Sequence, residues 1–148
     1  MPSESSDRLS VSLLCVELDY RGDLEANPRE QKALLADIAR VAGRHGGRDG
    51  ELQGSVFRVV FSVPFSRMPA RDAVAAAESL KAVLHRGPLQ VTWRVAIATA
   101  TSIAEGSVVY GDAMRIAKEL LDRADEGAIE IDPETARLVA SSTVGGRR

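Results

Sequence analysis

The segment VSLLCVEL, residues 11–18, is almost continuously apolar and compatible with a β-strand. A strand that is covered on both faces has such a run, whereas a strand with one face in water alternates polar and apolar residues. The run is far shorter than the ~20 apolar residues of a membrane-spanning helix. We therefore predict that it forms a central strand of a sheet.

Signals for helices and strands alternate along the rest of the chain. Asn27 is a favourable helix cap and Pro28 a favourable first helical residue, while Gly46-Gly47 ends the helical pattern. Two apolar runs within 51–63, joined near Gly54-Ser55, predict a β-hairpin. Periodicity also predicts a helix over 72–84, a strand over 90–101, a helix over 111–124, a strand over 128–131 and a last helix over 133–139.

This order of elements is typical of an α+β domain with a ferredoxin-like mixed β-sheet packed with α-helices. We expect the helices to cover mainly one face of the sheet. A length of 148 residues suits one domain, which we place at 9–140. Residues 1–8 and 141–148 are rich in Ser, Gly and charged residues and have little to bury, so we expect two disordered tails.

Composition argues against several classes of partner. A formal net charge of -2 does not provide the basic field that nucleic-acid binding requires. The chain has no apolar stretch of membrane-spanning length, and its first residues lack the pattern of a signal peptide. Cys15 is the single cysteine and lies in an apolar run, which favours a buried structural thiol in a reducing compartment. We expect a cytoplasmic protein without nucleic-acid or membrane partners.

Three segments, in this order, resemble the catalytic domain of class III adenylyl and guanylyl cyclases. They are the strand 11–18, the hairpin sequence GSVFRVVF at 54–61 and the stretch YGDAMRIA at 110–117, followed by GAIEI at 127–131. The resemblance covers nearly the whole chain and implies the class III nucleotidyl cyclase fold. A diguanylate cyclase domain shares this topology, and residues 52–57 can be aligned with its Gly-Gly-Asp-Glu-Phe signature. The C-terminal third favours the class III interpretation.

The resemblance places the two metal-binding aspartates of the family at Glu17 and Ser55. Glu17 keeps a carboxylate on a side chain one methylene longer, whereas Ser55 offers a neutral hydroxyl. Asp19 would share a strand face with Glu17 if the strand runs that far, and it is a weak candidate for a substitute ligand. The resemblance therefore implies a degraded metal site, and we expect no metal and no cofactor.

The other catalytic positions of the family are also replaced. The purine-reading lysine falls on Glu51 and its partner near Val108, and neither residue type can read a purine edge in the family's way. The two transition-state residues fall on Arg115 and Glu119, and Glu119 puts negative charge where the family has an arginine. An Arg and a Glu four residues apart on a helix more often form an exposed ion pair.

These replacements predict a catalytically degenerate cyclase homology domain that acts as a regulatory or dimerisation module in signalling. The expected partner is a second copy of the chain or another signalling protein. Two alternatives stay open, namely a nucleotide sensor that does not turn its ligand over, and an atypical class III adenylyl cyclase that uses Glu17 and Asp19. Arg and aromatic residues are enriched at the centres of interfaces. The interface candidates are Phe57, Arg58, Arg94 and Arg115.

Overall fold

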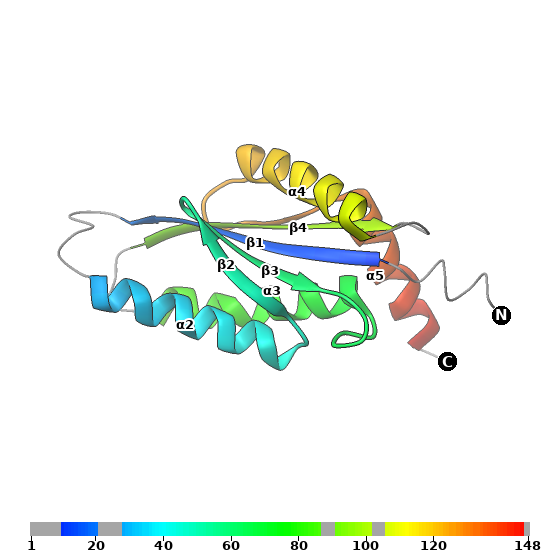
Figure 1. Cartoon of the computed structure of the whole chain (residues 1–148), viewed down its shortest axis with the longest axis horizontal. Coiled ribbons are helices and arrows are strands. Elements are labelled where there is room, and N and C mark those ends of the chain that lie inside the picture. The colour runs from blue at the N-terminus through cyan, green and yellow to red at the C-terminus, as the bar shows by residue number, and fades with distance from the viewer. Residues whose placement is uncertain (1–9, 21–27, 87–90, 102–105, 147–148) are drawn as a thin grey trace.

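The computed structural model describes residues 10–20, 28–86, 91–101 and 106–146 as helices, strands and their connections (Figure 1). In chain order the elements are β1 Ser10–Tyr20, α2 Pro28–Arg44, β2 Arg48–Gln53, β3 Val56–Phe61, α3 Pro69–Arg86, β4 Val91–Thr101, α4 Gly106–Arg123, β5 Ile129–Ile131 and α5 Pro133–Gly146. This is the predicted α+β order, with a mixed sheet at its centre.

The sheet has five strands in the order β2-β3-β1-β4-β5. β1 lies in its middle and pairs antiparallel with β3 on one side and β4 on the other, whereas β5 pairs parallel with β4. Five of the β1 side chains that we predicted to be covered, Leu13 to Val16 and Leu18, are at most 3% exposed. The prediction of a central buried strand is confirmed.

Helices cover both faces of this sheet, with α4 on one side and α2 and α3 on the other, which corrects the expectation of cover mainly on one side (Figure 1). Leu14 and Val16 point into a large cluster with α2 and α3, and Leu13 and Cys15 point into a second cluster with α4. The second cluster depends on small residues such as Ala113, because an alanine lets a helix approach the sheet closely. An alternation of large and small side chains in sequence could have indicated this second layer.

Several elements are longer than predicted. β1 continues to Tyr20, α3 begins at Pro69 and α4 begins at Gly106. α5 continues to Gly146, so residues 141–146, which we had assigned to a disordered tail, are helical. The predicted N-terminal tail and the predicted cap Asn27 lie outside the described residues.

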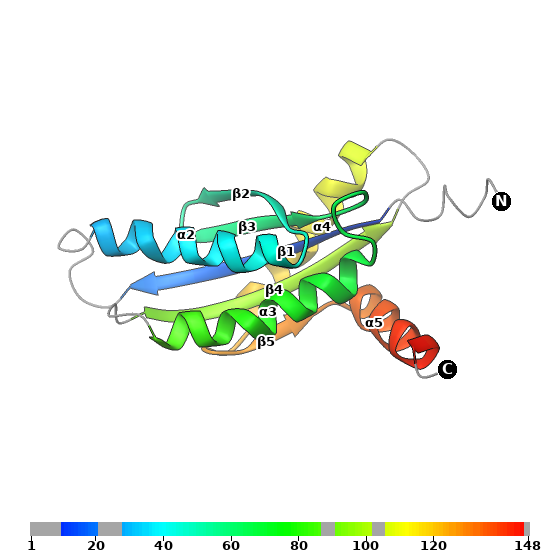
Figure 2. The same cartoon turned by 90° about the horizontal axis from the view of Figure 1, so that it is seen from below.

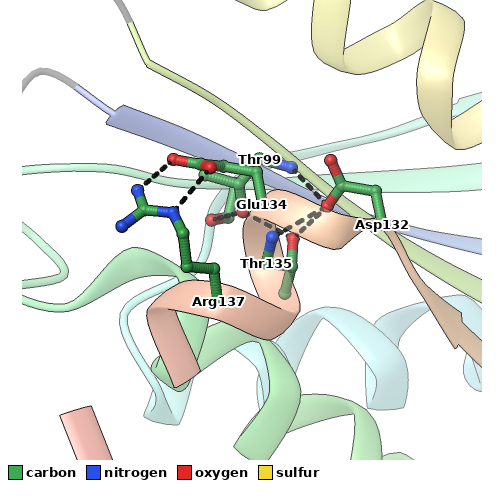
Figure 3. Close-up of polar contacts among 6 residues, drawn as sticks. Thr99, Asp132, Glu134, Thr135 and Arg137 are labelled. Carbon is green, nitrogen blue, oxygen red and sulfur yellow. Dashed lines mark hydrogen bonds and ion pairs between the residues drawn. The ribbon is translucent and has the colours of Figure 1, made fainter. Parts of the chain in front are cut away.

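A buried polar network fixes the start of α5 against β4 (Figure 3). Oδ1 of Asp132 accepts hydrogen bonds from the backbone N–H of Thr135 at 3.0 Å and of Thr99 at 3.3 Å, and from the Thr135 hydroxyl. The Thr135 hydroxyl also lies 2.7 Å from that of Thr99, which lies 2.6 Å from that of Ser12. Asp132 is therefore the predicted helix cap, and the network also ties α5 to β4 and, through the Thr99 and Ser12 hydroxyls, to β1.

Candidate functional site

The end of β1 meets the turn of the hairpin, and this is where the resemblance placed the metal site. The backbone N–H of Leu18 donates to the carbonyl oxygen of Ser55 at 2.9 Å, and Glu17 pairs across the sheet with Val56. The structure thus brings Glu17 and Ser55 together from positions far apart in sequence. Glu17 lies on the side of the sheet that α4 covers at its other end, since it shares a strand face with Cys15, two residues earlier.

Glu17 has a counterion within the chain. Arg94 is its partner on β4, and Nη1 of Arg94 lies 3.8 Å from Oε1 of Glu17. The Nε–H of Arg94 donates to the carbonyl oxygen of Ala124 at 2.9 Å, which fixes the guanidinium next to the carboxylate. Both side chains are about one-third exposed (29% and 32%), so water weakens the attraction without removing it.

A second arginine lies on the same face, on the other side of β1. Arg58 on β3 pairs with Cys15 across the sheet on one side and with Glu51 on the other. Its side chain is 11% exposed and forms an ion pair with Glu51, which is 56% exposed. Glu51, where the resemblance places the family's purine-reading lysine, is in contact with Arg58.

Arg58 also lines a pocket of about 220 Å³ between the hairpin and α4. The residues around it are Cys15, Gln53, Val56, Arg58, Met114, Lys118 and Leu121. Its walls are mostly apolar, with a guanidinium and an ammonium group among them. Such a pocket suits a small ligand that has an apolar body and negative charge.

Cys15 lies at the base of this pocket and is buried. Burial raises the pKa of its thiol to about 12, because the charged thiolate is poorly solvated there, and the nearby Arg58 offsets part of the rise. The thiol therefore stays protonated at neutral pH and is a structural group, as the sequence predicted.

The two residues of α4 that the resemblance places at the family's transition-state positions form the exposed pair that the helical spacing favoured. Nη1 of Arg115 lies 3.3 Å from Oε2 of Glu119, and both side chains are more than 60% exposed (62% and 61%). Val108 belongs to the first turns of α4, and its side chain lies outside the described part of the structure. Asp19 is inside β1, on the same face as Glu17, and is exposed.

One interface candidate is corrected by its burial. Phe57 is 6% exposed and packs in the core cluster on the α2 and α3 side, so its side chain cannot form a contact surface. Arg58, Arg94 and Arg115 all lie on the opposite side of the sheet, around α4 and the hairpin. The strand alternation already separated Phe57 from Arg58, and this signal could have excluded it.

These residues do not fit a pair of divalent ions. Such a site needs several carboxylate oxygens at fixed geometry, but Ser55 provides a neutral hydroxyl and the carboxylate of Glu17 faces Arg94. Within the described ranges, no group of three or more His, Cys, Asp or Glu side chains could hold a metal ion. Sequence reasoning missed the pairing of Arg94 with Glu17, because strand register alone determines which residues face each other.

No protein-family model matches the chain, and no curated protein matches it in sequence. Among the helices of the described segments, none is long and apolar enough to cross a membrane. Similarity to solved structures is extensive despite low sequence identity. The structure is similar to the monomeric guanylyl cyclase domain of the RhoGC fusion protein from the aquatic fungus Blastocladiella emersonii, with a TM-score of 0.75 and 17% identity over 90% of this chain and 86% of that one.

Three further solved structures are similar to this chain. A crystal structure of the non-canonical dimeric guanylyl cyclase domain of the same RhoGC fusion protein has a TM-score of 0.72 at 15% identity, covering 90% of this chain and 84% of that one. The adenylyl cyclase CyaB from P. aeruginosa has a TM-score of 0.65 at 17% identity, with coverage of 90% and 81%. The active GGEEF domain of a diguanylate cyclase from Vibrio cholerae has a lower TM-score of 0.61 at 13% identity, with coverage of 88% and 87%. The chain therefore has the fold of class III adenylyl and guanylyl cyclase catalytic domains.

Proposed function

We propose that this chain is a catalytically degenerate nucleotidyl cyclase homology domain that acts by associating with a second copy or another signalling protein. The observation that carries the proposal is the contact between Glu17 and Arg94, whose guanidinium is also held by the carbonyl oxygen of Ala124. The guanidinium of Arg94 is the counterion of the Glu17 carboxylate, a role that a bound metal ion would otherwise have. Ser55, beside it, adds no charge for a second ion.

The remaining positions support the same conclusion. Cyclisation of a nucleoside triphosphate builds negative charge around the phosphates, which metal ions and basic side chains must stabilise. Glu119 brings negative charge to a position where the family has an arginine, and Glu51 is engaged with Arg58. A loss of metal ligands together with a loss of the transition-state pair also prevents a homodimer from completing one site with its second copy.

A direct assay tests the loss of catalysis. The full chain is incubated with ATP or GTP and with Mg²⁺ or Mn²⁺, and cyclic nucleotide is quantified by mass spectrometry. We expect no product above a heat-inactivated sample. Product formation that Glu17→Ala abolishes, and that Glu130→Ala at an exposed position of β5 preserves, would contradict the proposal and favour an atypical cyclase.

The association is tested by light scattering over a range of concentrations. We expect a homodimer at micromolar concentration through the face that carries Arg58, Arg94 and Arg115. Arg115→Glu is the best variant, because that side chain is 62% exposed and its change should leave the fold intact. Arg29→Glu, at an exposed position at the start of α2, is the matched control. A monomer at millimolar concentration would exclude the homodimer and leave an external partner.

The pocket next to Arg58 favours a second candidate function, that of a nucleotide sensor without turnover. Its apolar walls, with Lys118 and Arg58 among them, could accept a base and a phosphate without any metal ligand. Calorimetry with nucleoside triphosphates and cyclic nucleotides separates the two candidates. Binding that Met114→Trp blocks would support the sensor, whereas no heat at millimolar ligand would support association alone.

A further inference from the structure

A second surface, on the other side of the sheet, lies where α2 ends and α3 begins, beside the loop that follows β3 (Figure 2). A hollow of about 670 Å³ opens here between the two helices and the loop. The residues that line it are Arg44, His45, Gly46, Phe65, Arg67, Met68 and Asp72. None of them belongs to the cluster around Glu17.

Exposed apolar side chains are concentrated at this hollow. Four large apolar side chains are exposed among the described residues, and three of them lie in this one loop. Val63 is 52% exposed, Phe65 57% and Met68 42%, and the last two line the hollow. Single exposed apolar residues are ordinary on protein surfaces, but a contiguous group with a polar rim marks an interaction site.

Side-chain and backbone hydrogen bonds hold the loop that carries these side chains in place. Ser66, between Phe65 and the following arginine, is 1% exposed, and its hydroxyl donates to Oδ2 of Asp72 at 2.7 Å. Its backbone N–H donates to the carbonyl oxygen of Ser62 at 2.9 Å. Gly46 packs so tightly that a Cβ atom there would lie 2.6 Å from the carbonyl oxygen of Phe65. A surface that is already ordered loses little entropy when a partner binds.

Arginines surround the apolar side chains. Arg44 and Arg67 line the hollow, and the guanidinium carbon of Arg48 lies 4.3 Å from the centre of the Phe65 ring. Nη1 of Arg71 lies 3.9 Å from the sulfur of Met68. Among the lining residues the one carboxylate is that of Asp72, which accepts the Ser66 hydroxyl. This is a local positive surface on a chain of net charge -2.

We propose that this hollow binds an acidic peptide segment of a partner protein, one that places an apolar side chain against Phe65 and Met68 and carboxylates near the four arginines. Charge complementarity requires an anionic partner, and fork-shaped guanidinium groups match carboxylates well. The concave shape favours an extended chain over a bilayer surface, because a side chain can enter the hollow and a flat membrane cannot. The proposal goes beyond the proposed function and does not depend on the loss of catalysis or on the α4 face.

Fluorescence anisotropy with the full chain tests this site. The probe is a short labelled peptide in which glutamates alternate with leucine and phenylalanine, and a second peptide has lysine in place of every glutamate. We expect the glutamate peptide to bind and the lysine peptide not to bind. Arg67→Glu and Phe65→Ser should each weaken binding by about tenfold, and added salt should weaken it further.

Matched controls keep the result interpretable. Arg29→Glu changes an exposed arginine at the other end of α2, and Leu52→Ser changes an exposed apolar residue on β2, so both should bind as the unmodified chain does. Thermal midpoints verify that every variant is folded. Equal binding of both peptides, or binding that Arg67→Glu leaves unchanged, overturns the proposal. Tighter binding to phosphatidylglycerol vesicles or to oligothymidine overturns it too, because the surface then serves a membrane or a nucleic acid.

Discussion

Replacing Asp132 by alanine should destabilise the protein substantially, because one carboxylate oxygen serves three donors. Oδ1 of Asp132 accepts from the N–H of Thr135, the N–H of Thr99 and the hydroxyl of Thr135 (Figure 3). The bond to Thr99 continues the β4–β5 ladder past the end of β5, where the backbone N–H of Asp132 also donates to the carbonyl oxygen of Ile97 at 3.1 Å. Asp132 is 3% exposed, so water does not readily replace it.

The donor and the acceptor of each hydrogen bond in this network are also fixed. A carboxylate oxygen can only accept, so the Thr135 hydroxyl donates to Asp132 and must accept from the Thr99 hydroxyl. The Thr99 hydroxyl in turn must accept from Ser12. Loss of the carboxylate removes a helix cap, worth about 1 kcal/mol, and leaves buried donors that each cost about 1 kcal/mol or more. We expect Asp132→Ala to lower the free energy of unfolding by about 3 kcal/mol.

Urea unfolding followed by circular dichroism measures this change. The predicted loss corresponds to a fall of about 6–12 °C in thermal midpoint for a domain of this size. Asp132→Asn keeps an acceptor oxygen and should cost less than half as much. Glu134→Ala on the same helix, where the ion pair with Arg137 is exposed, should change stability by less than about 0.5 kcal/mol. A loss below about 1 kcal/mol for Asp132→Ala would refute the reasoning.

Three other predictions concern the core, the thiol and a tight turn. Leu14→Asp buries an uncompensated charge at a position that is 0% exposed and should unfold the domain, whereas Leu52→Asp at 47% exposure should not, as thermal melts will show. Burial in the native state raises the pKa of the Cys15 thiol from 9.0 to about 12. Above about pH 9 the unfolded chain loses this proton while the native protein keeps it, so the thiol lowers the free energy of unfolding as pH rises. The free energy of unfolding should fall more steeply with pH there than in Cys15→Ala, and equal slopes in urea titrations would contradict the shift. Gly46 has φ +96, and an added Cβ would meet the carbonyl oxygen of Phe65, so Gly46→Ala should cost about 1–3 kcal/mol; an unchanged thermal midpoint would count against this.

The order of elements could be predicted from sequence, because each depends on local signals. An apolar run over 11–18 indicated the central strand, and Pro28 and Gly46-Gly47 bounded a helix within two residues of its observed ends. Asp132-Pro133 marked the start of the last helix correctly. Hydrophobic periodicity, caps and turn residues act within a few positions of the chain, so one sequence contains them in full.

Tertiary structure alone decided what surrounds Glu17. The family resemblance placed Glu17 in one site with Ser55, but the contact with Arg94 depends on a register that joins residues 17 and 94. The same holds for the hollow near Phe65, whose arginines come from α2, β2, the loop and α3. Local patterns determine which residues form a strand or a helix, whereas the packing of distant elements determines which charges meet, and that packing is a property of the whole chain.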